Sequence, residues 1–187
     1  MGKEDRKFKY AMIEKSARAR DYEDAVEWLT LAGLVHRIFE VQTLRLPLSS
    51  CKNSSAFKLY LLDVGLLRTK FRLDPETIMT GDRLFIEFKG VLTENYVLQS
   101  LERQFGSDIF YWTSGNTAEV EFIIQHSQKI VPIEAKSSLS VKSKSFSEYR
   151  KKYVPELSVR LSLKNVTNDD DLLNLPLYLA DHLSQII

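Results

Sequence analysis

Residues 118–138 read AEVEFIIQHSQKIVPIEAKSS, two apolar-rich runs separated by a polar stretch. The runs predict two antiparallel strands, Glu119–Ile124 and Ile130–Lys136, joined by the polar residues between them. Because side chains alternate along a strand, we expect one face of this hairpin to be apolar and to lie in the core. That face carries Val120, Phe122, Ile124, Val131, Ile133 and Ala135.

The opposite face of the hairpin carries Glu121, Glu134 and Lys136. In one register, with Ile124 opposite Lys129, the two carboxylates lie one diagonal step apart. Neighbouring carboxylates repel each other, and a divalent cation such as Mg²⁺ or Mn²⁺ would hold them together. The lysine would then supply positive charge or orient an attacking water. The alternative is a salt-bridged, half-exposed face of an edge hairpin.

A third carboxylate, Glu94, lies on the apolar stripe of a helical segment predicted over Leu84–Phe105, which is either one long helix or two helices joined near Gly90. A carboxylate that faces the core needs a partner, which makes Glu94 a candidate member of the same site. Glu87 and Glu102 also fall near that stripe, so the signal is not unique to Glu94.

Further elements extend from the hairpin in both directions along the chain. After the long helix we expect a strand over Asp108–Thr113, then the hairpin, a helix over Ser143–Tyr153, a strand over Leu157–Leu163 and a final helix over Leu172–Ile187. The fold class is therefore α/β (α+β), with the order α-β-β-β-α-β-α. The β-α-β portion predicts a right-handed crossover onto one sheet.

The first part of the chain predicts a separate unit. A helix ending at Gly33 is followed by strands over Leu34–Val41, Thr43–Leu48 and Ala56–Leu61, with the polar loop SSCKNSS between the last two. Helices followed by such a ribbon are typical of a winged-helix module. We therefore divide the chain into a winged-helix-like segment, residues 1–80, and a second domain, residues 81–187.

Composition limits the classes of function. The 187 residues are 44% hydrophobic and 27% charged, with a net charge of +1, so any basic surface must be local. Basic residues gather in Met1–Arg20 and Lys136–Lys164. The single cysteine, Cys51, excludes an intramolecular disulfide framework and a Cys-rich zinc site. With no secretory signal and no apolar run of membrane-spanning length, we expect a cytoplasmic protein without membrane insertion.

Six blocks carry a resemblance to a known family: FKLYLLDVGLL (Phe57–Leu67), GVLTENYVLQSL (Gly90–Leu101), FYWTS (Phe110–Ser114), AEVEFII (Ala118–Ile124), VPIEAKSS (Val131–Ser138) and LPLYLA (Leu175–Ala180). In this order they resemble the C-terminal domain, of unassigned function, that follows the ATPase domain in many prokaryotic AAA-type ATPases. The likeness runs from about Phe8 to Leu183. No Walker motif is present, so the resemblance implies that ATP is bound only by a preceding ATPase domain outside this chain.

The resemblance implies a winged helix followed by a restriction-endonuclease-like domain of the PD-(D/E)xK type. Glu94 then matches the helix glutamate, Glu121 the first metal-binding acid, and Glu134 with Lys136 the E-x-K pair. Implied roles are Glu121 and Glu134 as ligands of Mg²⁺ or Mn²⁺, and Lys136 and Glu94 as catalytic residues. The sequence departs from the family at one point, because Glu121 stands where an aspartate is usual.

Three functions remain open at this stage. The first is a nuclease-like accessory domain that binds DNA and hydrolyses a phosphodiester with Mg²⁺. The second is a non-catalytic module that docks on DNA or regulates the ATPase. The third is a protein-interaction arm that couples the ATPase to a partner. Enzyme status is therefore undecided from the sequence.

Overall fold

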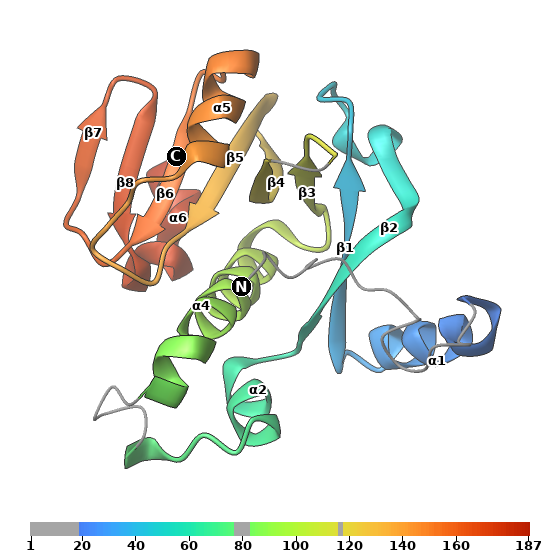
Figure 1. Ribbon diagram of the computed structural model, residues 1–187. Coiled ribbons are helices and arrows are strands. Elements are labelled where there is room, and N and C mark those ends of the chain that lie inside the picture. Colours follow the sequence, from blue (N-terminus) through green and yellow to red (C-terminus); the bar gives the residue numbers. More distant parts are fainter. Residues whose placement is uncertain (1–18, 77–82, 116–117) are drawn as a thin grey trace.

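The computed structural model describes residues 19–76, 83–115 and 118–187 (Figure 1). Its α-helices are α1 (Ala19–Leu31), α2 (Val64–Lys70), α4 (Arg83–Phe105), α5 (Lys144–Tyr153) and α6 (Leu183–Ile186), with 3-10 helices η2 (Leu48–Cys51) and η3 (Leu177–His182). The strands are β1 (Val35–Val41), β2 (Lys52–Leu61), β3 (Ile109–Thr113), β4 (Glu119–His126), β5 (Lys129–Ala135), β6 (Ser158–Ser162), β7 (Thr167–Asp169) and β8 (Leu172–Pro176). The fold is thus mixed α/β.

The strands form one eight-stranded mixed sheet in the order β2-β1-β3-β4-β5-β6-β8-β7. Strand β1 is parallel to β3, and β5, β6 and β8 are parallel to one another, while the other neighbours are antiparallel. The predicted order α-β-β-β-α-β is present as α4-β3-β4-β5-α5-β6. Helix α5 connects the parallel strands β5 and β6.

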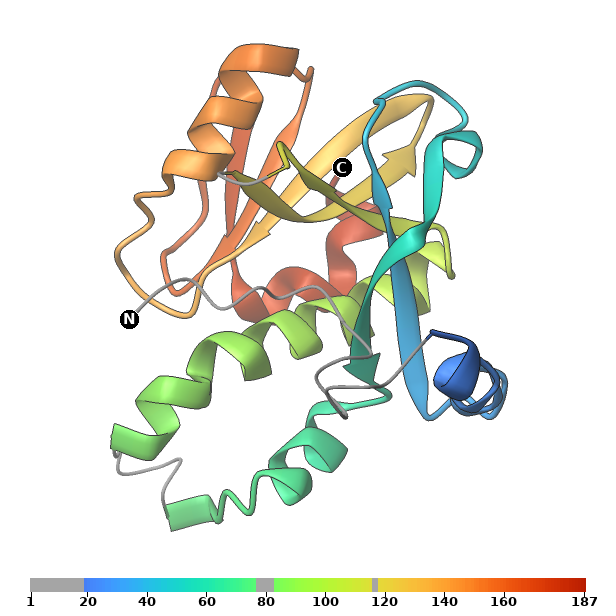
Figure 2. The ribbon, with the colours of Figure 1, turned by 45° about the vertical axis from the view of Figure 1, so that its right-hand side comes forward.

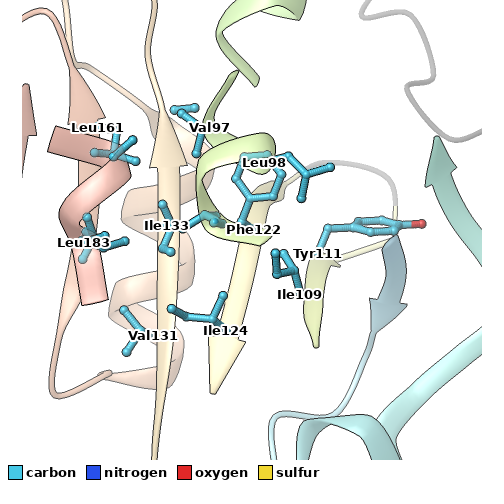
Figure 3. Close-up of a cluster of buried hydrophobic side chains, with 14 of the residues drawn as sticks. Val97, Leu98, Ile109, Tyr111, Phe122, Ile124, Val131, Ile133, Leu161 and Leu183 are labelled. Atoms are coloured by element: carbon cyan, nitrogen blue, oxygen red, sulfur yellow. The ribbon is translucent and has the colours of Figure 1, made fainter. Parts of the chain in front are cut away.

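Two hydrophobic clusters cover the two faces of the sheet. One packs α4, η3 and α6 against the sheet, and the other includes Phe146 and Tyr149 of α5. Figure 2 shows α4 and the C-terminal helices on one side of the sheet and α5 on the other. In Figure 3, Leu98 of α4 lies beside the ring of Phe122, and Ile133 lies on the other side of that ring; all three side chains are fully buried.

The central hairpin is antiparallel as predicted, but its register differs from the example given above. Ile124 pairs with Val131, because the turn contains only Ser127 and Gln128, both with positive φ (47° and 63°). Two consecutive positive-φ residues form the tight turn that suits a twisted hairpin. Continued by one residue, this register brings Glu121 directly beside Glu134.

One expectation about the hairpin faces is wrong. Val120 belongs to the cluster on the α5 side, together with Ile123, whereas Phe122 and Ile124 belong to the cluster on the α4 side. The pairing of β3 with β4 shifts between Phe110 and Trp112, where β4 has one residue more than β3. Such a bulge breaks strict alternation and re-aims the side chains on either side of it.

The ribbon near the N-terminus also differs from the prediction. Thr43–Leu48 is not a strand, and β2 begins at Lys52, inside the predicted polar loop. The polar residues join the sheet because Asn53 pairs with Glu40 and donates a hydrogen bond to its carboxylate (3.0 Å). Residues 54–56 bulge out before regular pairing resumes at Phe57. The first eighteen residues, including most of the basic stretch Met1–Arg20, lie outside the described residues.

The predicted final helix over Leu172–Ile187 is wrong in its first third. Residues Leu172–Pro176 form β8, which pairs in parallel with β6, and only the remainder is helical. Leu172, Asn174 and Leu175 are buried there. A short apolar run has no periodicity that separates a buried strand from a helix, so the pairing partner decides.

The sheet crosses the boundary drawn at residue 80. Phe39 and Glu40 of β1 pair with Phe110 and Tyr111 of β3, and the Glu40 side chain accepts a hydrogen bond from Thr113. The two segments distinguished in the sequence therefore share one sheet. None of the helices in the described residues combines the length and apolar character needed to cross a bilayer.

Candidate functional site

Lys136 follows the last residue of β5 and lies between two buried carboxylates. Its Nζ is 3.2 Å from Glu134 Oε1 and 3.7 Å from Glu121 Oε1. The Lys136 backbone N–H donates to the carbonyl of Leu161 (2.8 Å), which fixes this end of β5 beside β6. The structure thus brings Glu121, Glu134 and Lys136 together around one ammonium group.

Glu94 belongs to the same neighbourhood. It is a buried residue of α4, and the Tyr60 hydroxyl donates to its Oε2 at 3.5 Å. Its negative charge acts on Glu121, whose pKa it helps to raise. Of the two other glutamates near the stripe, Glu87 is outside the residues whose side chains are described, and Glu102 pairs with His36 (2.6 Å).

Glu121 has a strongly shifted proton affinity. Its pKa is raised from 4.5 to about 7, and burial is the largest cause; the charge of Lys136 opposes the rise, whereas the charges of Glu94 and Glu134 add to it. Near neutral pH, Glu121 is therefore able to gain or lose a proton. A carboxyl of this kind is a candidate acid or base wherever a ligand reaches it.

Glu134 has a second cation that the sequence analysis missed. Arg160 of β6 is its register partner, and Arg160 Nε donates to Glu134 Oε2 at 2.7 Å. Glu134 is 1% exposed. The available signal was a basic residue between Val159 and Leu161 in a strand with no other charged residue, because a charge in a buried strand requires a partner.

The residues do not fit a divalent cation as they stand. Each Glu134 oxygen already contacts a basic group, Lys136 on Oε1 and Arg160 on Oε2. Across the residues described, no group of three or more His, Cys, Asp and Glu side chains is placed to hold a metal ion. The metal-binding and catalytic roles assigned to Glu121, Glu134, Lys136 and Glu94 stay predictions.

Comparison with known families divides the chain in two. Residues 89–178 match the model of a domain of unknown function (DUF4143), and residues 1–77 match that of a second domain of unknown function (DUF8612). The first match begins inside α4 and ends inside η3. It contains Glu94, Glu121, Glu134, Lys136 and Arg160, so the whole cluster lies in the matched segment.

No curated protein and no solved structure matches the chain significantly. The two matched families carry no assigned activity in their descriptions. Function must therefore be argued from the cluster and from the surface around it.

Proposed function

We propose that this chain is a nuclease-like accessory module of an AAA-type ATPase that docks on DNA without cleaving it. One observation carries the non-catalytic part of this proposal: both oxygens of Glu134 are engaged by Arg160 and Lys136. Each oxygen keeps a second lone pair, but a divalent ion bound there would lie close to the positive charges of Arg160 and Lys136, which oppose its binding.

The arrangement of elements supports the nuclease-like part. The order α4-β3-β4-β5-α5-β6 and the E-x-K pair at the end of β5 agree with what the resemblance implies for a restriction-endonuclease-like core. The winged-helix interpretation of residues 1–80 is part of the same proposal, with strands β1 and β2 of that segment continuing the sheet of residues 81–187. The preceding ATPase domain is the expected partner within the protein.

Helix α5 offers the surface for DNA. It buries Phe146 and Tyr149 against the sheet, and Lys144, Lys151 and Lys152 are exposed on its other side. Their spacing of seven and eight residues places them on one stripe of the helix, with Glu148 also exposed there. Lysines on one surface bind phosphates through electrostatic attraction without reading sequence.

The test measures binding of a fluorescent DNA duplex to the chain at several salt concentrations. We expect the triple variant Lys144→Ala/Lys151→Ala/Lys152→Ala to bind more weakly, with a log–log salt slope that is less steep by roughly two to three. The control Arg45→Ala/Arg68→Ala/Lys70→Ala removes the same number of exposed charges elsewhere. Equal losses in the two variants, or no binding by the unmodified chain, would contradict DNA docking on α5.

Cleavage is tested in parallel with supercoiled plasmid and Mg²⁺ or Mn²⁺. We expect no product. Nicking that disappears in both Glu134→Gln and Lys136→Ala would instead establish the metal-dependent phosphodiesterase. Absence of both binding and cleavage would favour the protein-interaction arm.

A further inference from the structure

Glu134 and Arg160 form an ion pair between adjacent parallel strands. The register of β5 and β6 sets the two residues side by side, and the Nε–Oε2 distance is 2.7 Å. The side chains are 1% and 12% exposed, so the pair is almost completely removed from water. A buried carboxylate without a cation would be costly, and this strand pairing supplies one.

The whole cluster contains three carboxylates and two cations. Glu121 and Glu134 lie against Lys136, Arg160 pairs with Glu134, and the charge of Glu94 acts on Glu121. The common way to gather three carboxylates is a divalent cation, which compensates two charges. Here a lysine and an arginine together supply the same two charges.

Arg160 is held in place on its other side as well. Its guanidinium carbon lies 5.6 Å from the centre of the Phe146 ring, and Phe146 is a fully buried residue of α5. An arginine does not lose its proton in proteins, so its charge is permanent over the accessible pH range. A divalent ion that approached Glu134 Oε2 would be repelled by a guanidinium that both the strand register and an aromatic ring hold in place.

From this geometry we infer that Arg160 is a built-in counter-ion that takes the place of a divalent cation in this cluster. The inference concerns the stability and metal binding of the chain and does not depend on DNA docking. It also gives a specific consequence: removal of Arg160 makes the cluster dependent on an added cation.

The test uses thermal unfolding of the chain at pH 8, with and without Mn²⁺ at matched ionic strength. We expect Mn²⁺ to leave the Tm of the unmodified chain unchanged and calorimetric titration to show no saturable heat. Arg160→Met should lower the Tm by roughly 10 °C. Added Mn²⁺ should raise the Tm of Arg160→Met again, by part of the loss. The double variant Glu134→Gln/Arg160→Met should also have a higher Tm than Arg160→Met, without any metal.

The control is Arg150→Met, which removes an arginine from an ion pair with Asp171 outside the cluster. Its Tm should not respond to Mn²⁺. Saturable Mn²⁺ binding by the unmodified chain would overturn the inference, as would an Arg160→Met chain that neither Mn²⁺ nor Glu134→Gln stabilises. If Arg160→Met alone fails to fold, the titration of the unmodified chain and the Tm of the double variant still decide.

Discussion

Glu121 and Lys136 form a loose ion pair, with 3.7 Å between Oε1 and Nζ. The contact does not offset the burial of the carboxyl group, because the pKa of Glu121 is still raised to about 7. Two neighbouring glutamates add to the effect. The ionised form of Glu121 is therefore the disfavoured form in the folded protein.

The first prediction concerns Glu121→Gln. The folded chain holds the Glu121 proton more tightly than the unfolded chain, so the stability this group contributes is complete below about pH 4.5 and is lost as pH rises to about 7. The variant should gain about 3 kcal/mol relative to the unmodified chain between pH 4.5 and pH 8. Urea unfolding at pH 5 and pH 8 measures the difference. The exposed Glu27→Gln should show no such pH dependence, and an equal effect of Glu121→Gln at both pH values would contradict the prediction.

The second prediction concerns the hairpin turn. Ser127 and Gln128 both have positive φ, a conformation that costs an ordinary residue about 1–2 kcal/mol and favours Asn and Gly. Ser127→Asn/Gln128→Gly should therefore stabilise the chain by about 1 kcal/mol in urea unfolding. Gly33→Ala, at a φ of 69° after α1, should destabilise it by a similar amount. Changes of the same sign in the two variants would argue against the turn geometry.

The third prediction tests the core on the α4 side. Phe122 is fully buried, and Phe122→Ala should cost about 3–5 kcal/mol in the free energy of unfolding. Tyr178 is 68% exposed, and Tyr178→Ala should change stability by less than about 0.5 kcal/mol. Similar costs at the two positions would show that β4 does not pack as described.

The fourth prediction concerns Asp171, at the turn before β8. Its hydrogen bonds from Arg150 lower the pKa of its carboxyl group, so the stability that it contributes is lost as pH falls through that lowered value. Arg150→Met should raise the pKa of Asp171, measured by NMR titration of the carboxyl carbon. Because the pair is partly exposed, the cost at neutral pH should stay below about 1 kcal/mol. An unchanged titration would refute the ion pair.

Local patterns in the sequence predicted the central hairpin, the long helix α4, helix α5 and strand β6. Alternation of apolar residues over several positions indicates the two strands of the hairpin. Apolar residues at helical spacing over several turns indicate α4. Ser143, the first residue of the predicted helix, is the N-cap of α5 and accepts a hydrogen bond from the Phe146 N–H at 3.3 Å. These features depend on neighbours in the chain, which is why a single sequence reveals them.

Features that depend on distant residues could not be predicted. The bulge in β4 is a property of its pairing with β3, and it is what places Val120 on the unexpected face. The role of Arg160 depends on a parallel register between strands separated by α5. The turn at Ser127 and Gln128 is a local feature, but it lacks the Asn-Gly sequence by which such turns are usually recognised.

Strand β1 contributes one flank of β3, although the two strands belong to segments that match different families. An expressed fragment beginning at residue 89 would lack β1, so the edge of β3 that pairs with β1 would be uncovered. The fragment would also begin inside α4. An uncovered strand edge is a template for self-association. Truncation at the boundary between the matched segments should yield an aggregating polypeptide, so crystallisation and binding work should keep both segments in one chain.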